Sequence, residues 1–363
     1  MNRGVSMSGA EPVRKQAPAR RALPLRPAGA VAVLFLLLVA SVTAATAIGV
    51  VQLPFFDALR VIVVKSLRLG VELDPGQASI VWTVRLPRVL VAGLVGFALA
   101  TSGAAMQGLF RNPLAEPGIV GVSAGGSMGA VIAIFLELQR HSVWAVPAAA
   151  FAGALFASWL AYALATRSGK TETATLLLAG VALTSLFGAI ISLLYHFVED
   201  GVLRQIVYWL MGNLAGKRWD HLAVASPFVL VGAVGLISLA TELNLLSGGE
   251  DDARALGVSV ERVKRWVLLF VSLATGAAIS ITGMIGFVGL IVPHILRLLI
   301  GPDHRWLLPT SGLAGASFLI LCDLVARVAF SPIELRTGIV TAIVGVPFFL
   351  YLLFSRREAV AWD

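Results

Sequence analysis

The sequence predicts an all-α membrane protein, a polytopic bundle of about ten transmembrane helices. Of its 363 residues, 58% are hydrophobic and only 13% are charged, whereas ordinary soluble domains carry about 25% charged residues. A soluble fold could not hide that much apolar surface, because a large part of any globule faces water. Apolar runs also recur at about the 17–25 residues that a helix needs to cross a bilayer. They do not alternate as the strands of a membrane barrel would.

Ten apolar runs follow one another along the chain, separated by short polar connectors. In order, the predicted spans are Ala28–Val51, Val89–Phe110, Gly118–Leu136, Val143–Ala165, Leu176–Phe197, Leu222–Ala240, Trp266–Thr282, Phe287–Ile300, Trp306–Val328 and Gly338–Phe354. The first run contains Ala45-Thr46-Ala47, which resembles a signal-peptide cleavage site, but the run is long and continues past it, so we expect a retained span. The eighth is short and contains Pro293, which indicates a kinked or partial span.

The ends of the chain predict its orientation. Residues 1–26 hold six basic residues and one Glu, and such a segment before an apolar run is a cytoplasmic anchor more often than a nucleic-acid-binding arm. We therefore expect a disordered basic tail at 1–27, a transmembrane domain at 28–354 and a C-terminal tail at 355–363. With an even number of spans both tails are cytoplasmic, and the protein is a multi-pass protein of the inner (plasma) membrane with no nucleic-acid partner.

Basic residues beyond the tail divide evenly between the two sides in this arrangement. Arg85, Arg88 and Arg327 are among those that the span order places on the outer side. Since basic residues normally favour the inside, their position suggests an acidic partner outside. Asp323 lies four residues before Arg327, so an ion pair along one helix face is the structural alternative.

Two short stretches resemble nucleotide-binding motifs. Ser168-Gly169-Lys170-Thr171 resembles the end of a P-loop, but Leu164 occupies the position of its first glycine and no strand precedes it. Leu246-Ser247-Gly248-Gly249-Glu250 resembles the signature loop of an ATP-binding cassette, without a P-loop before it. We expect neither to bind ATP. With the single Cys322 and no cluster of His, Asp or Glu at membrane depth, the sequence also predicts no enzyme activity, no cofactor and no metal site.

The segment 250–265 is the longest charged stretch after the tail. Three acids, Glu250 to Asp252, begin it and basic residues end it, which suits a short helix capped at Gly257 and followed by a second one beginning near Ser259. It is either a solvated connector or a docking element for a cytoplasmic partner.

Several blocks of residues stand in a characteristic order along the chain. They are Arg85-Leu86-Pro87-Arg88, Gln107 to Pro117, Leu178 to Leu183, Tyr208 to Gly212, Ala253-Arg254-Ala255-Leu256-Gly257, Gly286 to His294 and Asp323 to Arg327. Together they resemble the FecCD-type permeases of ATP-binding-cassette importers, and the resemblance covers about residues 55–354. One departure is Leu335-Arg336 after Glu334, where relatives carry Leu-Pro.

The resemblance implies partners and roles for named residues. Two permease chains, here expected as a homodimer, would enclose the path, with two copies of a cytoplasmic ATPase subunit below. Coupling to the ATPase would fall on Glu250, Ala253, Arg254, Leu256 and Gly257. Arg85, Arg88 and Arg327 would receive carboxylates of a periplasmic or lipoprotein substrate-binding protein, and Thr171, Thr173 and Thr175 would lie at the cytoplasmic gate.

The same family carries iron–siderophore complexes, heme and cobalamin. We expect an importer of an iron complex, heme or a ferric siderophore, with cobalamin as the alternative. An ion-coupled secondary transporter is a rival hypothesis, but such proteins carry buried carboxylates or histidines as coupling sites, and the spans here hold almost none.

Overall fold

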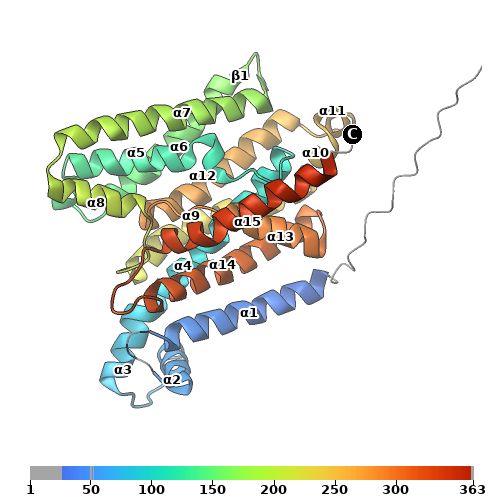
Figure 1. Ribbon diagram of the computed structural model, residues 1–363. Helices are drawn as coiled ribbons and strands as arrows, with labels where there is room; N and C mark the ends of the chain where they lie inside the picture. Colours follow the sequence, from blue (N-terminus) through green and yellow to red (C-terminus); the bar gives the residue numbers. More distant parts are fainter. Residues whose placement is uncertain (1–26, 50, 52, 361–363) are drawn as a thin grey trace, which may run out of the picture.

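The computed structural model describes residues 27–49, 51 and 53–360, and within them it is a bundle of helices with one small hairpin (Figure 1). In chain order the elements are α1 Pro27–Ala47, α2 Phe55–Ser66, α3 Pro75–Ser79, the π-helix η1 Ile80–Arg85, α4 Leu86–Leu109, η2 Pro117–Val120, α5 Val122–Phe135, η3 Leu138–Arg140, α6 Ala145–Ala165, β1 Thr166–Arg167, β2 Lys170–Thr171, α7 Thr173–Leu194, η4 Tyr195–Phe197, α8 Asp200–Leu210, α9 Trp219–Ser238, α10 Ala240–Gly248, α11 Glu250–Ala255, α12 Val260–Thr282, α13 Val288–Ile300, α14 His304–Val328 and α15 Thr337–Val360.

Each of the ten predicted spans corresponds to a helix, so the polytopic helical fold is confirmed. Among the described residues, seven helices are long and apolar enough to cross a bilayer, and α5, α13 and the apolar part of α15 are shorter. The third run is shortened because Gly121 takes the left-handed conformation, φ 81°, and divides it into η2 and α5. The eighth contains Pro293 within its 13 residues, as the partial-span prediction requires.

The predicted boundary of the C-terminal tail can be compared with the structure, whereas that of the N-terminal tail mostly cannot. The predicted tail at 1–27 lies outside the described residues except for Pro27. At the other end α15 continues to Val360, past the expected boundary at residue 354. Helix α1 begins and α15 finishes at the end of the bundle that also holds α10 and α11 (Figure 1). We call this the α11 end, and the opposite one, where α8 lies, the α8 end.

Helix α4 lies at the centre of the packing and is buried along almost its whole length. Glycines allow its neighbours to approach: a Cβ on Gly96 would lie 2.2 Å from the carbonyl oxygen of Gly315 in α14, and one on Gly103 would lie 1.9 Å from that of Gly289 in α13. Small residues provide this close backbone contact in lipid, where no hydrophobic effect drives helices together. The glycines therefore allow α4, α13 and α14 to form a tight bundle.

The outer helices leave large apolar side chains exposed. Leu178 and Val181 on α7 are 70% and 59% exposed, and Ile343 on α15 is 64% exposed. Exposed apolar surface of this extent is typical of contact with lipid or another chain. Helices α1 and α7 lie at opposite edges of the bundle, and α2 and α3 lie beyond the end of α1 (Figure 1).

Candidate functional site

Helix α11 is a short helix with a well-formed C-terminus at the α11 end of the bundle. Glu250, Asp251 and Asp252 form its first turn, where acidic side chains stabilise the helix dipole. At its other end Gly257 has φ 86°, and the N–H groups of Gly257 and Val258 donate to the carbonyls of Arg254 and Ala253, both at 3.0 Å. This pair of bonds is the Schellman arrangement, so the predicted cap at Gly257 is confirmed.

One side of α11 packs against the bundle, and the turn that follows the helix is exposed to solvent. Ala253 is fully buried and anchors the helix, whereas the Leu256 side chain is 68% exposed in the turn beyond it. An apolar side chain presented on a charged turn suits contact with a partner. Helix α12 begins at Val260 directly after Ser259, as expected, although the Ser259 side chain makes no capping hydrogen bond.

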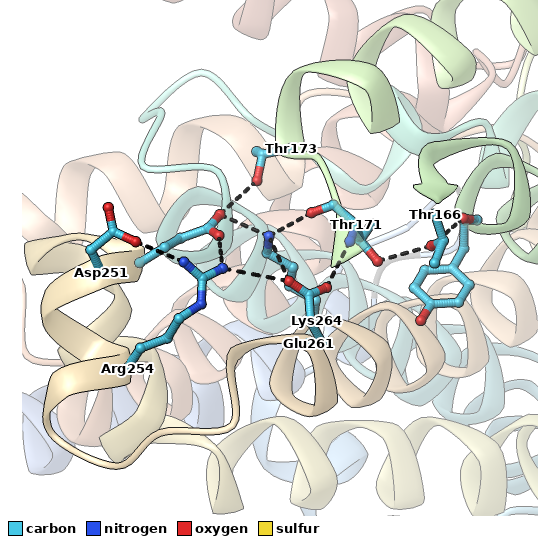
Figure 2. A network of polar contacts seen from close by, with 9 residues as sticks. Thr166, Thr171, Thr173, Asp251, Arg254, Glu261 and Lys264 are labelled. Carbon is cyan, nitrogen blue, oxygen red and sulfur yellow. Dashed lines mark hydrogen bonds and ion pairs between the residues drawn. The ribbon is translucent and has the colours of Figure 1, made fainter. Parts of the chain in front are cut away.

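Glu250 belongs to an ionic network whose other members include Thr173, Arg254 and Lys264, which are labelled in Figure 2. Its Oε1 accepts from Lys264 Nζ at 2.8 Å and from the hydroxyl of Thr173 at 3.0 Å, and its Oε2 accepts from Arg254 at 3.0 Å. Burial by itself would raise the pKa of Glu250, but the hydrogen bonds and charges of Lys264, Thr173 and Arg254 outweigh it and lower that pKa. Glu250 is therefore held as a carboxylate between two cations.

Lys264 and Glu261, one turn apart on α12, hold the backbone of strand β2. Lys264 Nζ donates to the carbonyl oxygen of Thr171 at 2.6 Å, and Glu261 Oε2 accepts from the Thr171 N–H at 2.8 Å. Lys264 and Glu261 also face each other at 3.7 Å. Only 3% of the Lys264 side chain is exposed, so its charge depends on these partners. The backbone N–H and C=O of Thr171 are thus both hydrogen-bonded to side chains of α12.

Thr171 lies in a two-residue hairpin between α6 and α7. β1 pairs with β2 through Thr166 and Thr171, whose hydroxyl oxygens are 2.9 Å apart. Ser168 and Gly169 form its turn with φ 52° and 76°, the pair of positive values typical of a tight hairpin turn. The stretch that resembles a P-loop is therefore a hairpin tip, and the other nucleotide-like stretch forms the end of α10 and the start of α11.

The network joins two segments that the sequence analysis assigned to different roles. Thr171 and Thr173, predicted for the gate, contact Glu261, Lys264 and Glu250 from the coupling segment. Thr175 is not part of the network, because its hydroxyl donates at 2.7 Å to the side chain of Glu172, the residue directly before α7. No individual role was predicted for Lys264 or Glu261. The available signal was the group of charged residues at 261–265, in the first turns of a helix that carries no charge from Trp266 onward.

The arginines predicted for docking lie together at the α8 end, but they are buried instead of exposed on a rim. Arg85, Arg88 and Arg327 are 6%, 7% and 5% exposed. Arg88 makes a two-pronged contact with Asp323, with Nε and NH2 each 3.0 Å from a carboxylate oxygen, and its NH1 lies 2.9 Å from Glu334. Such planar pairing is what a guanidinium does best.

The other two arginines bind the end of α1. Arg85 donates to the carbonyl oxygens of Thr46 and Ala47, at 3.0 and 2.7 Å, and to that of Val51. Arg327 donates to the Ala45 carbonyl at 2.8 Å, and its Nε lies 3.4 Å from Asp323, so the predicted pair along α14 is confirmed. These carbonyls have no helical partner. We expected Arg85 and Arg327 to be exposed, and this was wrong. The end of α1 supplies backbone carbonyl acceptors that bury these arginines, and a count of charged residues does not include such acceptors. Docking stays a prediction for these residues.

Comparison with known proteins places this geometry among transport proteins. The model of the FecCD transport family matches residues 36–355. The cobalamin import system permease BtuC of Halobacterium salinarum is 50% identical over 303 residues, 83% of this chain and 80% of that protein. The hemin transport permease HmuU of Yersinia pestis is 43% identical over 287 residues, 77% of this chain and 84% of that one.

A solved structure also resembles the chain over most of its length. It is described as an inward-facing conformation of a putative metal-chelate type ABC transporter, and it superposes with a TM-score of 0.78 at 36% sequence identity. The match covers 90% of this chain and 98% of that one.

Proposed function

Because the chain belongs to the FecCD transport family, whose members are membrane permeases of ATP-binding-cassette importers, we propose that it imports a tetrapyrrole-type metal chelate and couples that movement to ATP through the Glu250–Lys264 network. ATP hydrolysis takes place on a separate subunit, so the chain itself is not an enzyme. The network supports the coupling role because it connects α11 with β2 and the start of α7. The connection runs through the side chains of Glu250, Lys264, Glu261 and Thr173 and through the backbone of Thr171.

The coupling step follows from rigidity. An ATPase subunit that moves α11 displaces Glu250, and Glu250 is bonded to both Thr173 and Lys264. Lys264 and Glu261 in turn hold both backbone groups of Thr171. Since a charged network in a partly buried site resists separation of its members, the hairpin and the first turn of α7 move with α11. In this proposal the residues at 171–175 form the gate, and the α11 end is cytoplasmic.

Cargo is proposed from the relatives. Cobalamin and hemin are named for relatives at 50% and 43% identity, and both are metal chelates of a tetrapyrrole ring. Heme satisfies our expectation of an iron complex, and cobalamin is the second candidate, favoured by the more similar of these two relatives. The exposed apolar surface on α7 and α15 supports a second copy of the chain as the partner that completes the path.

Two further partners complete the proposed assembly. A substrate-binding protein delivers the cargo at the α8 end, where Arg88 and Glu334 lie beside each other. Glu334 is partly exposed, so a partner's basic or acidic groups can compete for this pair without unfolding α14. The membrane is the inner (plasma) membrane, with the basic N-terminal segment inside.

The test is ATPase stimulation by cargo. The permease is reconstituted in nanodiscs with its ATPase and its substrate-binding protein. The substrate-binding protein is loaded in turn with hemin, cobalamin or a ferric siderophore. We expect stimulation by a tetrapyrrole chelate and none by the siderophore. Stimulation by the siderophore alone would overturn the cargo proposal, and no ATPase response to any loaded binding protein would overturn the coupling proposal.

A further inference from the structure

A cavity of about 440 Å³ with both polar and apolar walls lies at the α8 end of the bundle. It is bounded by the ends of α5, α6, α9 and α12, by α8, and by the residue before α15. Ser280 and Thr282 line it, and they stand at the end of α12 that is remote from α11. The cavity therefore lies on the face where, in the proposed function, cargo arrives.

Two cationic side chains line this cavity without matching acids. Lys217 and Arg336 belong to its wall together with the His221 ring, and none of the described residues lining it is Asp or Glu. The nearest carboxylate with an effect on Lys217 is Asp220. That carboxylate is already bonded to Arg218 at 3.0 Å and to the His221 ring at 2.8 Å, so it leaves the cavity with a positive balance.

Lys217 has no side-chain hydrogen bond or ion pair with any residue in the described part of the chain. Burial lowers the pKa of Lys217 to about 8, and Asp220 opposes that shift only in part. At pH 7 the amine is still mostly protonated, so a half-buried cation with no partner among the described residues faces the cavity. An anion placed there would restore the interaction that the amine has lost with water.

The wall also provides a planar cation and an unused acceptor. The Arg336 guanidinium lies 4.4 Å from the centre of the Tyr208 ring, which fixes its plane while leaving its N–H edge free for an oxyanion. Across the cavity Gln139 donates to Gln205 at 3.4 Å, but its buried Oε1 accepts no hydrogen bond. Such an acceptor suits a hydroxyl or amide donor on a ligand.

We propose that this cavity is a subsite for the carboxylate or phosphate group of the cargo, bound by Lys217 and Arg336 with Gln139 accepting from a neighbouring donor group. The inference rests on the proposed function for the identity of the ligand, although the oxyanion chemistry comes from the cavity itself. A volume of about 440 Å³ holds one substituent of a large chelate. Arg336, the residue that departs from the Leu-Pro pattern, acquires a role here.

The subsite has a direct chemical reporter. With its lowered pKa, Lys217 reacts with an acetylating ester faster than an ordinary lysine, and a bound oxyanion should slow that reaction. The permease–ATPase complex is placed in nanodiscs of neutral lipid without ATP, and acetylation of Lys217 is quantified by peptide mass spectrometry. Lys65 on α2, which is exposed, serves as the internal control.

Two pairs of probes differ in an anionic group. Hemin is compared with hemin dimethyl ester, which lacks only the two carboxylates, and cobalamin with cobinamide, which lacks the phosphate together with its ribose and base. At ten times the dissociation constant of the probe we expect about tenfold slower acetylation of Lys217 for the anionic member of at least one pair. The member of the pair without the oxyanion should have little effect, and acetylation of Lys65 should not change. Equal protection within both pairs, or none, would overturn the subsite.

Variants and lipids complete the test. Arg336→Gln should raise the half-protecting concentration of the anionic probe about tenfold, whereas Arg204→Gln, on the exposed face of α8, should leave it unchanged. Protection by anionic lipid alone, in phosphatidylglycerol nanodiscs without a probe, would assign the cavity to a headgroup and overturn the cargo subsite. The acetylation assay contains no ATP, so its result does not depend on transport. If the anionic probe protects Lys217 but a separate assay with ATP shows no uptake, the proposed function fails and the subsite stands.

The pH dependence provides an independent check. The titratable or charged groups facing Lys217 are Asp220 and His221 on α9, Tyr208 on α8 and Arg336 before α15. Since the amine loses its proton as pH rises through about 8, the difference between hemin and its ester should shrink between pH 7 and 9. A difference that does not change over that range would remove Lys217 from the subsite.

Discussion

Replacing Lys264 by Met should disconnect α11 from the hairpin while leaving the bundle intact. The substitution removes the donor to the Thr171 carbonyl and the ion pair with Glu250 but keeps a long apolar side chain in the buried position. Removing one member of a fully buried ion pair costs about 3–5 kcal/mol. Glu250 and Glu261 keep 25% and 24% of their side chains exposed, and Arg254 contacts both, so we place the cost lower, at about 2–3 kcal/mol.

The loss should be visible at one backbone position. A cost of about 2–3 kcal/mol increases the opening of the local contact by about 30- to 150-fold. Hydrogen exchange of the Thr171 amide, which is bonded to Glu261, should accelerate by about that factor while exchange in α4 stays slow. Uptake should fall, and basal ATP hydrolysis by the bound ATPase should persist, because the interface on α11 remains.

Lys170→Met is the matched control, since Lys170 precedes Thr171 in β2 and is exposed. A double-mutant cycle with Glu250→Gln isolates the pair and should give a coupling energy of about 1–2 kcal/mol. If Lys264→Met behaves like Lys170→Met in both exchange and uptake, the network does not transmit movement and the reasoning fails.

Three other predictions concern the remaining contacts. Arg88→Ala should destabilise the protein by about 3 kcal/mol, because Asp323, 1% exposed, loses its principal partner; thermal unfolding in detergent measures it. Gly103→Val should prevent stable folding, because its Cβ would meet the Gly289 carbonyl oxygen at 1.9 Å; yield and elution of the monodisperse protein report it. The pKa of Glu250 is lowered in the folded state, so its stabilising effect is present above the ordinary carboxyl pKa of about 4.3 and is lost as pH falls through the folded value. The difference in unfolding temperature between wild type and Glu250→Gln should thus be constant from pH 7 to about 5 and should shrink below about pH 4.

Each of these has a result that contradicts it. Arg140→Ala, at a side chain 72% exposed, is the control for Arg88→Ala, and equal unfolding temperatures for the two variants would show that the Asp323 pair contributes nothing. A well-folded Gly103→Val would require α4 and α13 to be further apart than described. A pH-independent difference for Glu250→Gln would mean that the carboxylate is not the stabilising form.

Local sequence signals predicted the spans and α11, but they did not predict α2, α3, α8, the hairpin or the long-range contacts. The apolar runs, the acidic start of α11 and the cap at Gly257 are properties of a few neighbouring residues, so composition and spacing were sufficient. The Asp323–Arg327 pair, four residues apart, was also within reach.

The polar networks depend on helices brought together by packing. Lys264 meets Thr171 across 93 positions and Arg88 meets Asp323 across 235, and no periodicity encodes such a meeting. The arginines illustrate the consequence. Counting charges on each side of a membrane treats every basic residue as exposed, whereas Arg85 and Arg327 complete the hydrogen bonding of the end of α1.

The central claim, that the chain is a permease coupled to ATP through α11, is tested most directly by uptake into vesicles. The chain and its ATPase are reconstituted into proteoliposomes with the loaded binding protein outside, and accumulation of hemin or cobalamin is measured with ATP inside. The account predicts that accumulation requires ATP, stops with a hydrolysis-deficient ATPase and persists when ionophores collapse the ion gradients. Accumulation that continues without ATP and disappears with the ionophores would contradict it, and would identify an ion-coupled transporter instead.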